Sequence, residues 1–410
     1  MGKLDETHEF LDLFMHHIGQ SEVPRQFYWW AAMSLLAASV ADRVWIEPDV
    51  GRRIYPNLYV FLIGPSGSGK EQAVMAAARL GLHESALALF MGRGTRQFLL
   101  DYLSRGGELE EGVRIADKPK LYMVTEELGS AIRPGDLGHE LITFMTECYT
   151  HKPWTSDGTR MTGLVTLREP CFNWLAGTTD EWLIRAVDRD AIEGGFFARV
   201  ISTRGDRDYL HRYPKMLYPD DREEVIDHLK WRVSQYTLLT GKFVYAPETD
   251  ALHDTWYRER TAPLDRAEMP AFNRADEMIY RLSLLLKLSS IEEVISDEGI
   301  PWSIERQIEP QHFTEAVQLW DGLAVDMPET IRKASATERT EGVDVVADIM
   351  ARFGQLDHST LLKRVGNHGM DKDSLRSAVE TLKERGEVEE LPIQPTGGRP
   401  RRTYKWTGGS

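Results

Sequence analysis

Helical and strand-like hydrophobic patterns divide the chain into distinct segments. In the first 42 residues apolar positions recur at helical spacing and predict two helices, of which the second begins near Pro24. Between residues 43 and 205 short apolar runs alternate with helical stretches, which is typical of an α/β fold with a parallel sheet. The runs with the length and composition of strands are Val44–Ile46, Asn57–Ile63, Leu121–Val124, Cys171–Gly177 and Val200–Ser202.

The rest of the chain has a mostly helical pattern and ends in a small unit of its own. After a polar stretch come three short helical segments and two strand candidates, Glu387–Leu391 and Arg402–Trp406. Three helices with a two-stranded wing are the pattern of a winged helix. The expected organisation is a helical segment at 1–42, a core at 43–205, a helical lid at 206–334, a linker at 335–341 and a winged-helix domain at 342–410.

Composition excludes several classes of protein. A chain of 410 residues is too long for one compact core, and no apolar run reaches the ~18–20 residues that a membrane-spanning helix needs. The first residues lack the basic and then apolar layout of a signal peptide. Cys148 and Cys171 are too few for a disulfide framework or a zinc site, so we expect a cytoplasmic protein.

The charge is acidic overall and unevenly distributed. The net charge is −15, from 49 basic and 64 acidic residues, and such a protein is a poor non-specific binder of DNA. Residues 342–410 hold eleven Lys and Arg against ten Asp and Glu, so the net negative charge lies in the rest of the chain. Any contact with nucleic acid is therefore expected to be local, at a tail, a hairpin or the lining of a ring.

A glycine-rich turn follows the strand at Asn57–Ile63. The sequence Gly64-Pro-Ser-Gly-Ser-Gly-Lys70 fits the phosphate-binding pattern G-x-x-x-x-G-K, in which backbone amides and a helix N-terminus face the anion and the lysine neutralises the β- and γ-phosphates. An ordinary Gly/Ser turn is the alternative, but the strand before it and the helix after it favour a phosphate site. The residues expected to contact the nucleotide are Gly64, Pro65, Ser66, Gly67, Ser68, Gly69, Lys70 and Glu71.

Glu71 departs from the pattern, which has Ser or Thr after the lysine to ligate Mg²⁺. A carboxylate also suits this hard cation, but it adds negative charge beside the triphosphate. The sequence therefore supports the binding of ATP and Mg²⁺ more firmly than it supports rapid hydrolysis.

Two acids follow the apolar strand at Leu121–Val124. Ligands of open α/β sheets bind at the carboxyl ends of the strands, so Glu126 and Glu127 are site candidates. We expect Glu126, where Asp is usual, to hold Mg²⁺, with Glu71 as a further metal ligand. We expect Glu127 to polarise the attacking water. The alternative is a solvated helix start, where the helix dipole favours acids.

The order of these pieces resembles an AAA+-type ATPase module. More narrowly, it resembles a family of P-loop helicase-like replication proteins of phages and mobile elements, often fused to primases. The resemblance covers roughly residues 8–330 and implies an α/β P-loop NTPase core with a helical lid. The resemblance rests on four segments, the second of which contains the phosphate loop: Phe27-Tyr-Trp-Trp-Ala-Ala, Tyr55–Lys70, Phe172–Leu183 and Gly194-Gly-Phe-Phe-Ala-Arg-Val200.

The resemblance implies roles for three further residues. Thr179, or Thr178 beside it, would carry sensor 1, which contacts the γ-phosphate or the water, with a plain helix cap as the alternative for Thr179. Arg199 matches the arginine finger that reaches the γ-phosphate of a neighbouring subunit, with a surface arginine as the alternative. A finger implies a ring of identical subunits, which we expect to be a hexamer. Arg281 matches a lid sensor, but an arginine on a helix surface fits the pattern better.

A predicted hairpin at 152–168, with Asp157-Gly158 as its turn, is the first candidate DNA contact. In related helicases this insertion grips a single strand inside the channel. Lys152 and Arg160 would supply charge and Trp154 would stack on bases. The alternative is a hairpin that only packs against its neighbours.

The C-terminal unit offers a second candidate surface. Basic residues on its third helix and its wing suit duplex DNA, where phosphate contacts dominate, although many winged helices dock on proteins instead. These basic residues are Lys372, Arg376, Lys383, Arg399, Arg401, Arg402 and Lys405.

The main functional hypothesis is an ATP-dependent, ring-forming DNA helicase or translocase of phage or mobile-element replication, acting in the cytoplasm of a bacterial host. The alternative is a nucleotide-binding replication initiator or loader with weak or no ATPase activity, which Glu71 favours. A transcriptional regulator whose ATPase remodels a partner protein is a third hypothesis.

Overall fold

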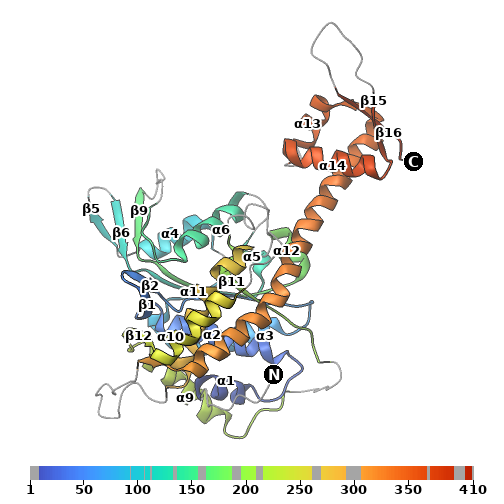
Figure 1. Cartoon of the computed structure of the whole chain (residues 1–410). Coiled ribbons are helices and arrows are strands. Elements are labelled where there is room, and N and C mark those ends of the chain that lie inside the picture. Colours follow the sequence, from blue (N-terminus) through green and yellow to red (C-terminus); the bar gives the residue numbers. More distant parts are fainter. Residues whose placement is uncertain are drawn as a thin grey trace. The chain divides into compact units, whose positions relative to one another are not determined.

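The chain is a mixed α/β protein, as its hydrophobic pattern predicts, and it forms two compact units (Figure 1). The first unit runs to Thr330 and the second begins at Ile331. In the residues that the structure describes, no helix combines the length and the apolarity that crossing a membrane requires. The computed structural model describes residues 9–92, 94–105, 107–110, 113–132, 136–155, 163–186, 195–208, 216–260, 269–291, 306–366, 370–391 and 402–408.

Five parallel strands form the central sheet of the first unit, in the order β11-β3-β10-β7-β4. Four of them coincide with predicted strands. The fifth, β4, was not predicted, because its three residues are too few to show the alternation of apolar and polar positions typical of a strand. All side chains of β3 and β10 are buried, as expected for strands covered on both faces. The bounds are β11 Val200–Arg204, β3 Tyr59–Ile63, β10 Cys171–Thr178, β7 Lys120–Thr125 and β4 Leu89–Met91.

Helix α2 (Arg25–Val40) packs on this sheet and on α3 (Lys70–Gly81). It is buried on nearly all sides because its sequence is apolar all round. Helix α1 (Glu9–Ile18) packs against α2 and against α9 (Arg222–Tyr236), so the two predicted N-terminal helices belong to this unit's core. The other helices are η1 Ser85–Leu87, α4 Arg96–Ser104, α5 Leu128–Ala131, α6 Asp136–Cys148, α7 Asp180–Ala186, η2 Phe197–Arg199, α10 Pro247–Glu259, α11 Met269–Ser289 and α12 Pro310–Phe353.

Two four-stranded sheets complete the first unit, in the orders β13-β12-β1-β2 and β5-β6-β9-β8. The region 206–334 is therefore not purely helical, because β12 and β13 join β1, which lies outside the central sheet. Strands β8 and β9 pair antiparallel, in agreement with the predicted hairpin. The bounds are β1 Val44–Asp49, β2 Arg52–Ile54, β12 Gly241–Tyr245, β13 Gln307–Ile308, β5 Glu108–Glu110, β6 Val113–Asp117, β8 Trp154–Thr155 and β9 Leu164–Arg168.

The second unit combines the end of α12 with α13 (His358–Gly366), α14 (Lys372–Glu384) and a three-stranded antiparallel sheet. The sheet has the order β14-β16-β15, and its first strand was not predicted. The expected linker at 335–341 is helical and lies inside α12, because residues 331–341 contain no Gly or Pro and are rich in good helix formers. The strands are β14 Gln355–Asp357, β16 Thr403–Trp406 and β15 Val388–Leu391.

Candidate functional site

The turn between β3 and α3 is built on glycines in a conformation that other residues avoid. Gly67 and Gly69 have φ values of +83° and +87°, in the left-handed region. Gly69 also packs so closely on Val23 that an added β-carbon would overlap with that side chain. The sequence thus folds residues 64–69 into a tight turn that ends at the first residue of α3.

Lys70 closes this turn from inside. Its side chain is only 5% exposed, and its Nζ donates to the carbonyl oxygens of Gly64 and Pro65 at 2.6 and 2.8 Å. Burial lowers the pKa of Lys70, while the charges of Glu127 and Glu71 oppose that shift. The ammonium group is therefore held by carbonyl oxygens of the turn, and the charges of Glu127 and Glu71 stabilise its charged form.

The end of β7 comes close to the start of α3 because β10, the strand between β3 and β7, has a glycine at this edge of the sheet. A β-carbon added to Gly177 of β10 would lie 2.6 Å from the carbonyl oxygen of Glu126 and 3.3 Å from Cβ of Lys70. The missing side chain lets the start of α3 and the end of β7 approach each other. The structure thus brings together the predicted turn and the predicted acidic pair.

Glu127 and Glu126 differ in environment. Glu127 is half-buried, and its Oε1 is buried with no hydrogen-bond partner in the described structure. Burial raises the pKa of Glu127, and Lys70 and the Gly129 amide partly offset the rise. Glu126 is exposed. Glu127 is therefore the acid whose pKa the Lys70 charge lowers, and its Oε1 accepts no hydrogen bond in the described structure.

Glu71 is exposed in the first turn of α3, and its charge acts on both Lys70 and Glu127. Among the residues that the structure describes, no three His, Cys, Asp or Glu side chains gather in a way that could hold a metal ion. Glu71 and Glu126 alone do not form a complete metal cage. Mg²⁺ commonly binds through one or two carboxylates together with substrate phosphates and water, so such a partial set still fits this ion.

The end of β10 also reaches the turn. The carbonyl oxygen of Thr178 accepts a hydrogen bond from the amide of Gly64 at 3.1 Å, and the Thr178 side chain is fully buried. The hydroxyl of Thr179 accepts from the amide of Trp182 at 3.3 Å, so it caps α7. Of the two threonines, Thr178 contacts the turn, whereas Thr179 makes the contact expected of a helix cap.

Arg199 and Arg281 are both buried away from this edge. Arg199 precedes β11, at the amino ends of the strands, where its Nη1 donates to the carbonyl oxygen of Gly195 at 2.6 Å. Arg281 is 3% exposed and donates to backbone and side-chain oxygens of Asn57. The expectation of a surface position for Arg281 is wrong, because α11 is buried along most of its second half.

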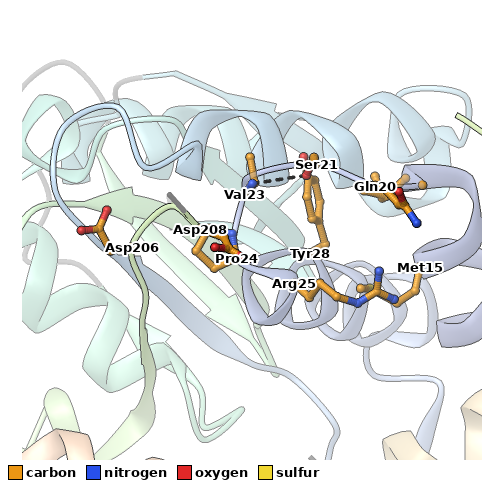
Figure 2. Close-up of a pocket in the computed structure, with 11 residues that line it drawn as sticks. Met15, Gln20, Ser21, Val23, Pro24, Arg25, Tyr28, Asp206 and Asp208 are labelled. Atoms are coloured by element: carbon orange, nitrogen blue, oxygen red, sulfur yellow. Dashed lines mark hydrogen bonds between the residues drawn. The ribbon is translucent and has the colours of Figure 1, made fainter. Parts of the chain in front are cut away.

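A cavity of about 370 Å³ lies where the start of α2 meets the segment after β11 (Figure 2). It is lined by Ser21 and Val23 from the segment between α1 and α2, by Tyr28 of α2, and by Asp206 and Asp208. Val23 links cavity and turn, since the same side chain covers Gly69. No motif marks this cavity in the sequence, and only the fold brings its two sides together.

The candidate DNA contacts of the hairpin are only partly described. Lys152 is exposed, whereas Arg160 and the turn of the hairpin lie outside the described residues. Trp154 packs edge-on against Phe144, with ring centroids 5.0 Å apart, and its Nε1 donates to Glu147 at 2.5 Å. These contacts favour packing over base stacking for Trp154.

In the second unit the basic positions are exposed, but several are paired. Lys383 Nζ lies 2.7 Å from Glu390 Oε2, and Arg402 Nε lies 3.8 Å from Glu390 Oε1. Arg376 lies 3.8 Å from Glu380, whereas Lys372 and Lys405 have exposed side chains. The sequence analysis did not identify Glu390 as a partner of these basic residues, although three acids between 387 and 390 indicated that acidic partners were available. The predicted contacts outside the described residues here are Arg399 and Arg401.

No family model matches this chain, and no curated protein matches it either.

Proposed function

We propose that this chain is a nucleoside triphosphatase of the AAA+-like P-loop type, with ATP phosphates bound in the turn at residues 64–70. The observation that carries the proposal is the close approach of the start of α3 and the end of β7 across Gly177, at the carboxyl ends of parallel strands, where Lys70 and Glu127 act on each other's pKa. The ammonium group of Lys70, the N-terminus of α3 and the Glu127 carboxylate, whose Oε1 has no hydrogen-bond partner in the described structure, thus belong to one edge of the sheet. These are the groups that phosphoryl transfer to water requires.

The residues fit a triphosphate and a magnesium ion. The turn amides and the N-terminus of α3 suit phosphate oxygens, and Lys70 would exchange the carbonyls of Gly64 and Pro65 for them. Glu126 and Glu71 would hold Mg²⁺ together with the nucleotide, and the ion would neutralise phosphate charge. Glu127 would orient the attacking water and accept its proton at the buried Oε1.

The adjoining cavity supplies space for the nucleoside. Its volume of about 370 Å³ lies within the range of small-molecule sites. Because Val23 touches both cavity and turn, a nucleoside there would lie beside phosphates in the turn. This supports a nucleotide over a free phosphate or a simple phosphoester as the ligand.

We further propose that hydrolysis serves work on DNA, as a ring-forming helicase or translocase of phage or mobile-element replication. Exposed Lys152, Lys372 and Lys405 support DNA contact, and the second unit has the element order of a winged helix. In a hexameric ring Arg199 would act on the nucleotide of the neighbouring subunit. Its 9% exposure means that the side chain must move outward to do so.

A second candidate is an initiator or loader that binds ATP and hydrolyses it weakly. The observation that favours it is the position of Glu71, whose charge acts on the same two groups that would handle the triphosphate. Its carboxylate repels phosphate oxygens in the place where a hydroxyl usually ligates Mg²⁺.

Turnover measurements distinguish these candidates. ATP hydrolysis is measured with Mg²⁺, with and without single-stranded DNA, for the wild type, Lys70→Ala and Glu127→Gln. The proposal expects DNA-stimulated turnover that both variants lose, with nucleotide affinity kept in Glu127→Gln. Binding without turnover above the Lys70→Ala background would support the initiator or loader instead. Loss of turnover in Arg199→Ala, restored by mixing with Glu127→Gln subunits, would identify a shared site.

A further inference from the structure

The indole ring of Trp182 packs against the backbone of Gly129, two residues after Glu127. Trp182 belongs to α7, and α5 begins one residue after Glu127. A β-carbon added to Gly129 would lie 2.5 and 2.6 Å from Cε3 and Cδ2 of the indole. The ring therefore occupies the place of a side chain at Gly129, although Trp182 remains 38% exposed.

Several contacts hold α7 in place and therefore fix the position of the Trp182 indole. The hydroxyl of Thr179 caps the helix at the Trp182 amide, and the next residue, Leu183, is buried in the core with Leu128 of α5. The carboxylate of Asp180 accepts a hydrogen bond from Arg204 Nη1 at 2.5 Å. Helix α7 is thus tied to the end of β11 as well as to α5.

The start of α5 fixes the backbone position of Glu127. The carbonyl oxygen of Glu127 accepts from the Ser130 amide at 2.9 Å, and Leu128 is fully buried. The Gly129 amide lies close enough to the Glu127 carboxylate to influence its pKa. A shift of Gly129 would therefore move the carboxylate relative to Lys70 and Glu71 on α3, the charged groups that face it.

We propose that Trp182 is a positioning residue, whose packing on Gly129 holds α5 and keeps Glu127 directed at the phosphate turn. This inference rests on the proposed hydrolysis, because it assigns Trp182 to the step that Glu127 performs. A tryptophan that merely covers the surface would contribute to stability and leave the ratio of turnover to binding unchanged.

The test combines four variants: Trp182→Ala, Trp182→Phe, Gly129→Ala and the double variant Gly129→Ala/Trp182→Ala. Single-turnover ATP hydrolysis, affinity for a fluorescent ATP analogue and the thermal midpoint are measured for each. Hydrogen–deuterium exchange of residues 125–132 reports on α5 without requiring turnover.

We expect Trp182→Ala to lower the hydrolysis rate at least tenfold, to change nucleotide affinity less than twofold and to speed exchange in α5. Trp182→Phe should restore most of the rate, since a ring again covers Gly129. Gly129→Ala should slow hydrolysis in the wild-type background, where its methyl group meets the indole, and should have little further effect in Trp182→Ala.

Three results would overturn the inference while leaving the proposed function intact. They are full turnover in Trp182→Ala, an equal effect of Gly129→Ala in both backgrounds, and unchanged exchange in α5. Equal losses of rate and affinity would also assign Trp182 a structural role only. Absence of turnover in the wild type above Lys70→Ala would overturn the proposed hydrolysis and this inference together, and the exchange data would still show whether Trp182 holds α5.

Discussion

Val23 covers Gly69 of the turn between β3 and α3 so closely that a β-carbon at this glycine would overlap with its Cγ2 atom. Val23 is 4% exposed and also lines the adjoining cavity, so one side chain connects the space proposed for the nucleoside with the turn proposed for the phosphates. The contact makes a direct prediction about the two left-handed glycines of the turn.

Gly67→Ala and Gly69→Ala should destabilise the protein to different extents. Both place alanine at a positive φ, which costs about 1–2 kcal/mol, but only Gly69→Ala also pushes a methyl group into Val23. We expect the second variant to lose about 1–3 kcal/mol more in the free energy of unfolding, measured with urea. Val23→Ala should recover part of that difference in Gly69→Ala and none in Gly67→Ala, because no described atom lies within 4 Å of a β-carbon at Gly67. Equal losses in both variants would contradict the contact.

Replacing Glu71 should strengthen the binding of ATP when Mg²⁺ is absent, because the carboxylate then has no ion to hold and only repels the phosphates. Its exposed carboxylate acts on Lys70 and Glu127, so removal of the charge in Glu71→Gln should lower the Kd for Mg²⁺-free ATP about threefold to tenfold at low salt. The gain should shrink as salt screens the charge. Glu71→Thr should show the same gain in affinity and, in addition, faster turnover, since a hydroxyl suits Mg²⁺ at this position. Calorimetric titration and steady-state assays measure the two effects. If neither variant changes the Kd, Glu71 does not face the triphosphate.

The stability of the first unit should fall in mild acid because of His151. Its Nε2 lies 3.0 Å from Asn57 Oδ1, and its buried Nδ1 has no hydrogen-bond partner among the described residues. Burial and the charge of Arg281 lower the pKa of His151 from 6.5 to about 3. The unfolded chain takes up the proton first, so the contribution of neutral His151 is complete above pH 6.5 and is lost as the pH falls toward 3. His151→Gln keeps a donor for Asn57 and cannot titrate.

Between pH 7 and pH 5 the wild type should therefore lose about 2 kcal/mol of unfolding free energy relative to His151→Gln. Urea unfolding at the two pH values measures this difference. His83→Gln, at an exposed position, is the matched control and should behave as the wild type does. Parallel pH dependence of the wild type and His151→Gln would show that His151 is not held neutral.

The central sheet was predictable because its strands are continuous apolar runs that end in turn residues or acids, as in β3 and β7. The position of the glycine-rich turn beside the acids Glu126 and Glu127 was predictable for the same reason, since parallel strands align their carboxyl ends at one edge. What the sequence did not reveal is which acid faces Lys70. That depends on packing between α5 and α7, where Gly129 meets Trp182.

Contacts between distant segments account for the other differences. Strand β12 is five residues long and is recognisable only beside β1, about 200 residues earlier in the chain. Arg281 looks like a surface residue by type, yet it is buried because oxygens of Asn57 and Tyr55 and the ring of Tyr149 surround its guanidinium group. The pairing of Lys383 with Glu390 likewise appears only when β15 folds back toward α14.

Glu390 should lower the affinity of the second unit for DNA. Its carboxylate pairs with Lys383 at 2.7 Å and with Arg402 at 3.8 Å, and the pairing with Lys383 lowers its own pKa and raises that of the lysine. In Glu390→Gln both cations become available to phosphates. The affinity for duplex DNA should rise about threefold to tenfold at low salt, and each additional phosphate contact should steepen the salt dependence by about 0.9 in slope.

Fluorescence anisotropy of a labelled duplex across a range of KCl concentrations measures both quantities. Glu223→Gln is the matched control, because it removes one negative charge from an exposed pair with Arg222 in the first unit. If net charge alone governed binding, the two variants would gain affinity equally. A gain confined to Glu390→Gln would place duplex DNA at α14 and β16, whereas no gain in either variant would favour a protein partner for that surface, because the freed cations would then have no phosphates to meet.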